Sequence, residues 1–407
     1  MALTEIPMLE EHTVSQATRS ERGERLLRRG GGWLMFCCLL MGQLGAPWDG
    51  EWHGYVGRDW FWTPPHVLIY SCVGGGGLIA LIMVLIETWR YQKGYIDDQS
   101  TVCIFRVFHA PLGYIVGGFG ALAALFAAPF DNYWHELYGI DISLWSPFHI
   151  MGVTGCFIGS LGIVYVLASE MAVERQSEQK IRRWLGFSML EWGALFVLAS
   201  LLQLTLTGFL LFPVIEIGLL RIPTYMLPAV LCAGLCQVGA SHLTARPGAA
   251  IYMTLLLCIA AFATELFVPS ATRSLVQAQG LHYRVPGQAP TFQLNRALLP
   301  LYLLPSALMV DGIAFWQARH RVPSYHKQRH LWLLGLLMSI PQMLIAPCFL
   351  MWTANPLAAF LNTPDLLIAP HLKVYTALLA VPVMLTAGMV GAWWGASAGD
   401  TWYLSRQ

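Results

Sequence analysis

The sequence has little charge. Only 12% of its 407 residues are charged, against 56% that are hydrophobic, and the mean hydropathy is +0.55. Soluble domains carry about 25% charged residues, so this shortage argues against a water-soluble globular protein. The formal net charge of +1 leaves no basic stripe of the kind that binds nucleic acid. We therefore expect a membrane protein that is surrounded by lipid and has no nucleic-acid partner.

The sequence also lacks the cysteine patterns of disulfide or metal sites. Its nine Cys residues lie within apolar stretches, apart from Cys103 at the end of one, and no CxxC motif occurs. Buried Cys usually behaves as a small apolar residue. No ladder of Met or Cys follows an apolar stretch, as a metal-transport path would require, and no segment reads as a soluble domain.

Apolar stretches of about 20 residues recur instead, and each is long enough to cross the roughly 30 Å hydrocarbon core of a bilayer. We predict an all-α, polytopic transmembrane helical bundle with about ten spans. The predicted spans are 32–48, 64–90, 106–130, 146–170, 187–212, 223–243, 248–268, 298–317, 331–352 and 372–395.

The basic residues predict the orientation of these spans. If both termini are cytoplasmic, 18 of the 24 Lys and Arg residues lie on the cytoplasmic side, as the positive-inside rule requires. Residues 1–31 form a polar segment without a cleavage site after the first span, so we expect a retained anchor. We predict an integral multi-pass protein of a bacterial inner or plasma membrane.

An internal repeat stands out in the N-terminal half. Residues 46–66 read APWDGEWHGYVGRDWFWTPPH and residues 128–149 read APFDNYWHELYGIDISLWSPFH, with ten identical positions once one insertion is allowed. Each copy joins two predicted spans, so the repeat unit is two helices and the repeat is parallel. Both copies then face the same side of the membrane, which the charge distribution makes the outer, periplasmic side.

The spacing within each copy suits metal binding. Asp49 and His53 are four residues apart, as are Asp131 and His135, and residues four apart are neighbours on a helix. Carboxylate and imidazole side chains near a bilayer cost free energy unless they are paired or bind a metal. Interfacial anchoring by Trp, Tyr and His is the structural alternative. The repetition of the whole cluster favours metal binding over this alternative.

The last His of each copy follows a helix-start signal. Thr63 or Ser146 suits the N-cap, and a Pro follows at the first helical position. His66 and His149 then stand in the first turn of a span, where the positive end of the helix dipole favours a neutral imidazole, the form that binds metal. The predicted ligands are Asp49, His53, His66, Asp131, His135 and His149.

Three further carboxylates are candidates for hydrogen bonding to the ligating histidines or for a proton path. Asp59 and Asp141 recur in the two copies, although Asp59 also has Arg58 beside it as an ion-pair partner. Glu265 lies near the outer end of the seventh span, and an ionisable group in a span is a functional candidate. Asp311, His282 and His371 are weaker candidates.

The first motif resembles the copper-site motif of the C subunit of the particulate methane and ammonia monooxygenases. The resemblance rests on Asp49-x3-His53-x12-His66, with its WH and TPxH contexts, and on Asp131-x3-His135-x13-His149, which is similar to that subunit's second metal site. The family usually has Asn at the first position of the second motif, so Asp131 adds a negative charge there. The resemblance covers about residues 30–170 and implies two adjacent metal sites on the outer side.

The sequence thus suggests a four-helix metal-binding unit, 32–170, and a six-helix unit, 187–407, of unknown role. The leading hypothesis is an O₂-dependent oxidative enzyme, or a subunit of one, acting on a small apolar substrate. The resemblance implies copper, while two His and one carboxylate also suit non-haem iron, and zinc is a further alternative. Partners similar to the A and B subunits, or a homo-oligomer, are expected. The alternatives are a copper- or zinc-handling protein without catalysis and a structural subunit of a larger membrane complex.

Overall fold

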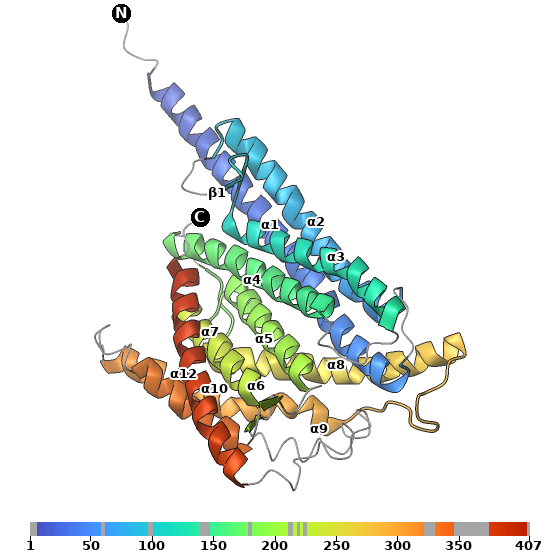
Figure 1. The fold of residues 1–407 in the computed structure, drawn as a ribbon. Helices are drawn as coiled ribbons and strands as arrows, with labels where there is room; N and C mark the ends of the chain where they lie inside the picture. Colours follow the sequence, from blue (N-terminus) through green and yellow to red (C-terminus); the bar gives the residue numbers. More distant parts are fainter. Residues whose placement is uncertain are drawn as a thin grey trace, which may run out of the picture.

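A computed structural model of the chain shows a bundle of helices with two short β-hairpins (Figure 1). Six helices in the part that it describes are long and apolar enough to cross a membrane, which supports an integral multi-pass protein. The described residues are 6–57, 62–96, 101–138, 147–177, 181–210, 215–217, 220–222, 226–320, 330–345 and 374–404.

The N-terminal half is built from four helices and a fifth that packs on them. Hairpin β1–β2 (Val102–Ile104 and Phe108–Ala110) connects the second helix to the third. Figure 1 shows α1, in blue, running beside α2 and extending past it at the N-terminus. The helices are α1 (Ile6–Tyr55), α2 (Pro64–Gln92), α3 (Leu112–Tyr138), α4 (Pro147–Gln176) and α5 (Met189–Leu210).

Glycine allows α3 and α4 to pack with their backbones almost touching. A Cβ atom on Gly120 would lie 2.2 Å from the backbone nitrogen of Gly159, and one on Gly162 would lie 2.4 Å from the nitrogen of Gly117. Helices within lipid gain no hydrophobic driving force from contacting each other, because the acyl chains around them are equally apolar. They associate through close packing, which small residues allow. This close packing ties the two helices of the second repeat together.

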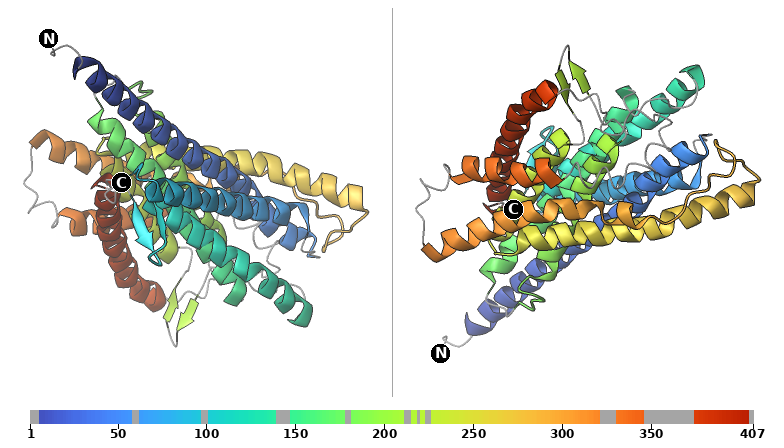
Figure 2. Two further views of the ribbon diagram at one scale, coloured as in Figure 1. Left: turned by 90° about the horizontal axis from the view of Figure 1, so that it is seen from above. Right: turned by 90° about the horizontal axis from the view of Figure 1, so that it is seen from below.

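The C-terminal half packs around α8, which lies against α1, α5 and α10. The last helix, drawn in red in Figure 2, packs against α4, α6, η2 and α7. The elements are hairpin β3–β4 (Ile215–Ile217 and Leu220–Ile222), α6 (Met226–Ala233), the π-helix η2 (Gly234–Val238), α7 (Gly239–Thr244), α8 (Ala249–Gln279), α9 (Leu294–Ala297), the 3₁₀ helix η3 (Leu299–Leu303), α10 (Leu304–His320), the helix His330–Ile345 and α12 (Val374–Leu404).

Helices lie within all ten predicted spans, although several boundaries differ. Helix α3 begins at Leu112 rather than at 106, because a β-strand precedes Pro111. Helix α8 continues through Pro269 to Gln279, about three turns beyond the predicted end at 268. The span 223–243 contains a turn of π-helix, whose packing against Gly391 and Gly395 of α12 brings the two backbones together. The number of membrane crossings stays a prediction.

Segments that the charge distribution assigns to the cytoplasm contact one another. Arg175, at the end of α4, donates hydrogen bonds to the backbone carbonyls of Leu243 and Tyr403, and His242 Nδ1 lies 2.8 Å from Asp400. Arg246 pairs with Glu191 at 2.9 Å. The ends of four helices that alternation predicts to share one side therefore meet at one end of the bundle.

A buried group of ion pairs lies at this same end of the four-helix unit. Arg28 and Arg29 of α1 pair with Glu87 of α2 at 2.7 Å and with Glu170 of α4 at 2.8 Å. Glu24 and Arg90 join the group at about the same depth. Glu87 follows His66 by 21 residues, and Glu170 follows His149 by the same number. Along a helix that is about 32 Å, close to the hydrocarbon thickness of a bilayer, so the polar groups lie at both ends of an apolar span.

Candidate metal centre

Three predicted ligands of the first motif converge on one point. Asp49 Oδ1 lies 3.0 Å from His66 Nε2 and 3.6 Å from His53 Nε2. One potential ligand atom from each of these residues lies within 4.8 Å of the others. Within the described part of the chain, this is the one group of three or more His, Cys, Asp or Glu residues arranged so closely. We call Asp49, His53 and His66 the first cluster.

Local helix geometry produces this convergence. Asp49 and His53 stand one turn apart near the C-terminal end of α1, and His66 stands in the first turn of α2. Thr63 occupies the N-cap with an extended backbone and Pro64 follows it, as predicted, although the Thr63 side chain makes no capping hydrogen bond. The chain reverses between the two helices and places the three side chains face to face.

The donor atoms fit a metal ion. Oδ1 of Asp49 is buried, and the imidazole nitrogens of His66 and His53 approach it to 3.0 Å and 3.6 Å. A buried carboxylate is costly unless a cation compensates it. One carboxylate and two imidazoles suit Cu(II), Zn²⁺ or non-haem Fe(II), and three protein ligands leave a further position open.

Electrostatics in the first cluster favour the ionised carboxylate. Burial raises the pKa of Asp49, which lies beyond the predicted span 32–48, but the imidazoles of His53, His66 and His149 together lower it to about 2. The carboxylate is therefore charged at neutral pH, as a metal ligand must be. The contribution of His149 shows that the second repeat lies close enough to act on the charge of Asp49.

The second motif forms a looser pair. Asp131 of α3 and His149 of α4 approach each other, with Asp131 Oδ2 3.8 Å from His149 Nδ1, and both side chains are partly exposed. His135 lies in α3, but its side chain is outside the described part of the structure. Asp59, Asp141 and His371 also lie outside the described residues. The structure thus brings three of the six predicted ligands, Asp49, His53 and His66, together in the first cluster, and it places Asp131 beside His149.

Glu265 does not face the predicted ligands directly but belongs to a group that supports them. Its Oε1 accepts the backbone N–H of Gln293, and Arg296 Nε lies 3.6 Å from its Oε2. The same Arg296 lies 3.7 Å from Glu51, which also accepts a hydrogen bond from the hydroxyl of Thr272 at 3.0 Å. Glu265 is therefore linked to the outer end of α1 through one arginine.

Burial is strong in this supporting group. Glu51 lies two residues from both Asp49 and His53 along the chain, and it is 2% exposed. Desolvation raises its pKa to about 7, although Arg296 and Thr272 act in the opposite direction. Glu51 was missed by the sequence analysis because the second repeat has Tyr133 at the matching position. The repeat therefore carries no signal for Glu51.

The outer end of α8 and the loop after it cover the end of α1. Trp52 and Val56 pack against Val276 in a small apolar cluster. Arg284 in the loop donates from its backbone N–H to the carbonyl of Tyr55 at 2.8 Å and from its guanidinium to the carbonyl of His53 at 3.2 Å. These contacts hold the turn of α1 that carries the first cluster, and they explain why α8 continues past the predicted end of its span.

The remaining candidate residues lie away from the first cluster. The Asp311 carboxylate accepts backbone N–H groups of Ala250 and Ile251 at the start of α8, which is the role of a helix cap. His282 is exposed in the loop after α8. Neither of them is in the group that contains the first cluster.

Comparison with known proteins gives no independent support for a family. No family model matches the chain, and neither a curated protein nor a solved structure matches it.

Proposed function

We propose that this protein is a membrane metalloprotein whose first cluster holds a metal ion for oxidative chemistry, either as an enzyme or as a subunit of one. The observation that carries the proposal is the convergence of His53 and His66 on one buried oxygen of Asp49. The C-terminal end of α1 and the start of the long, apolar helix α2 present these three side chains at the end of the bundle opposite the buried ion pairs.

Copper is the metal that the motif resemblance favours, with iron and zinc as alternatives. A bound copper or iron ion would supply the activation of O₂. The chain's own residues hold the ion with two imidazoles and one charged carboxylate. Three residues outside the first cluster position it. Arg284 donates a hydrogen bond to the backbone carbonyl of His53, and the buried Glu51 beside the ligands is held by Thr272 and Arg296.

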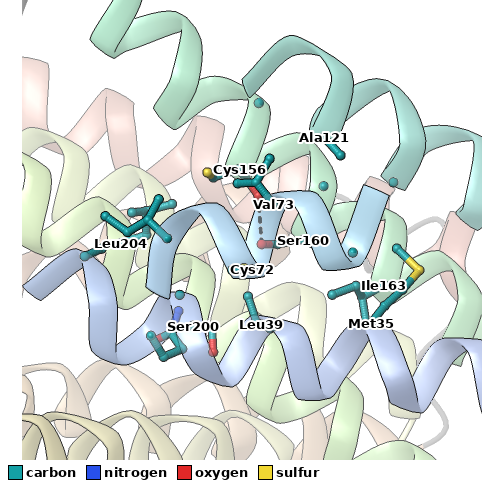
Figure 3. A pocket seen from close by; sticks show the side chains of 18 of the residues that line it. Met35, Leu39, Cys72, Val73, Ala121, Cys156, Ser160, Ile163, Ser200 and Leu204 are labelled. Carbon is teal, nitrogen blue, oxygen red and sulfur yellow. Dashed lines mark hydrogen bonds between the residues drawn. The ribbon is translucent and has the colours of Figure 1, made fainter. Parts of the chain in front are cut away.

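A largely apolar cavity lies between α1, α2, α3, α4 and α5, inward from the first cluster (Figure 3). Its lining includes Ala46 and Pro47, just before Asp49 in α1, and Ile69, one turn after His66 in α2. The residues that the structure describes in this lining carry no charged side chain. An uncharged lining supports the choice of a small uncharged substrate over a charged one.

The proposed function has a direct test in membranes of the cell that makes the protein, where any A- and B-like partners are also present. With propene as the probe, a quinol as the reductant and isotopically labelled O₂, we expect labelled epoxide to form and to disappear with His66→Ala. If the protein binds metal but no labelled epoxide forms, the protein has a metal-handling or structural role instead.

The outward orientation of the first cluster has its own test. A Cys introduced at Gly54, in the last turn of α1, should react with a membrane-impermeant thiol reagent in intact cells, because the charge distribution puts this end of the bundle outside. The matched control is a Cys at Ser177, just after the end of α4 at the opposite end, which should react only after lysis. The reverse pattern would overturn the orientation.

Asp131→Asn tests the second motif, where the chain departs from the family pattern. A carboxylate attracts a divalent ion more strongly than an amide dipole does, so we expect weaker metal binding at the second site and an occupied first cluster. The measurement is metal stoichiometry across a chelator titration. A variant that matches the wild type throughout would mean that Asp131 binds no metal.

A further inference from the structure

The cavity beside the first cluster has features that a purely apolar binding site would not need. It has a volume of about 90 Å³ and lies between α1, α2, α3, α4 and α5 (Figure 3). A cavity of about 150 Å³ holds benzene, so this one accommodates a molecule of only a few carbon atoms. Most of its lining is aliphatic or glycine, with the sulfur atoms of Met35, Cys72 and Cys156 among it.

Glycines create this space. Gly76 of α2 lines the cavity on the same helix face as Cys72, Val73 and Gly77, and a Cβ atom added to Gly76 would meet no atom within 4 Å. A larger side chain there would enter the cavity without a backbone clash. Gly74 also has room for a side chain, but it does not line the cavity, because two residues along a helix correspond to a rotation of about 200°.

Two polar groups on the lining lack hydrogen bonds. Ser200 of α5 is 3% exposed, and its hydroxyl has no hydrogen-bond partner within the described part of the chain. The Oε1 atom of Gln43 in α1 is likewise buried without a donor. Ser160, by contrast, donates to the carbonyl of Cys156 at 2.8 Å, as Figure 3 shows. A buried polar group without a partner is costly, so Ser200 and Gln43 point to an occupant that can form hydrogen bonds.

The chemistry of the two groups narrows the occupant. The amide oxygen of Gln43 needs a donor, which excludes hydrocarbons, ethers and ketones as its partner. A charged amine or carboxylate would lose its hydration in a lining without an opposite charge. Water could satisfy the polar groups, but it would leave the aliphatic part of the cavity unfilled. A neutral hydroxyl on a short carbon chain meets both requirements.

We propose that this cavity is a binding site for a short-chain aliphatic alcohol. Ser200 and Gln43 supply the polar contacts, and the face of α2 around Gly76 receives the carbon chain. The proposal goes beyond the proposed function, because binding in the cavity requires no metal and no turnover. Its position next to Ala46 and Pro47 places the alcohol within about two helical turns of Asp49 along α1.

The test uses the full-length, metal-free protein in lipid nanodiscs and 3-fluoropropan-1-ol as the probe, followed by fluorine NMR. We expect saturable binding, weaker by about tenfold with Ser200→Ala, since one hydrogen bond is lost. Gly76→Leu should abolish saturable binding, whereas the matched control Gly74→Leu should retain it. Gln43→Leu should act as Ser200→Ala does, and thermal unfolding of each variant shows that the fold is intact.

Several outcomes would overturn the proposal. Absence of saturable binding to the wild-type protein would mean that water or nothing fills the cavity. Equal affinity for 1-fluoropropane, together with no effect of Ser200→Ala, would mean a purely apolar site. Binding that survives Gly76→Leu would place the alcohol elsewhere. Because no metal is present, these outcomes are independent of whether the first cluster performs oxidative chemistry.

Discussion

Replacing His66 with Ala is expected to lower the affinity of the first cluster for a divalent metal by about 100-fold or more. Loss of a mere hydrogen-bond partner of a metal ligand already costs about 10- to 100-fold, and His66 Nε2 approaches the buried Asp49 oxygen to 3.0 Å. The measurement is a competition titration against a chelator of known affinity, with metal content followed by elemental analysis.

His242→Ala is the matched control for this variant. His242 also contacts an aspartate, with Nδ1 2.8 Å from Asp400 Oδ1, but at the opposite end of the bundle. Its removal should leave metal affinity unchanged. If His66→Ala keeps the wild-type affinity, or if His242→Ala loses as much, the assignment of the first cluster is wrong. Simultaneous loss of metal and of the folded state would favour a metal that only staples α1 to α2.

Glu87→Ala is expected to destabilise the protein by about 3–5 kcal/mol, the cost of breaking a buried ion pair by removing one partner. Glu87 is fully buried and pairs with the buried Arg28 at 2.7 Å. Its removal leaves the Arg28 guanidinium beside fewer compensating charges. The free energy of unfolding, measured by titration with a denaturing detergent in mixed micelles, reports the change.

The double variant Arg28→Met with Glu87→Leu separates charge from packing. Replacing both charges of a buried pair by apolar groups of similar volume is often neutral or stabilising, so the double variant should be more stable than Glu87→Ala. Glu136→Gln, on the exposed end of α3, is the surface control and should change stability little. A Glu87→Ala variant as stable as the wild type would mean that the pair is not buried in the membrane-embedded protein.

The sequence predicts much of the fold because apolar length and charge placement are local properties. Helices lie within each predicted span, and His66 stands in the first turn of α2 after Thr63 and Pro64 as expected. The end of α8 could not be predicted, because Pro269 and the polar residues after it suggest a loop. Their helical state depends on contacts with α1, such as the packing of Val276 against Trp52.

Only those residues of the candidate site that recur in the internal repeat could be predicted from the sequence. Asp49, His53 and His66 recur in the second copy and were identified from the sequence, whereas Glu51, Thr272 and Arg296 occur once and come from distant helices. Glu265 was singled out as an ionisable group in a span, but its link through Arg296 to Glu51 depends on tertiary structure. The cavity likewise arises from glycines of four helices, and no pattern within one helix reveals it.

The most direct test of a metal centre at the first cluster is X-ray absorption at the metal edge, combined with elemental analysis, on the purified full-length protein. The account predicts a bound metal with imidazole and carboxylate ligands, and loss of the imidazole signature in a variant carrying both His53→Ala and His66→Ala. A protein that purifies without metal and takes up none, or a metal whose ligand spectrum is unchanged in that double variant, would contradict it.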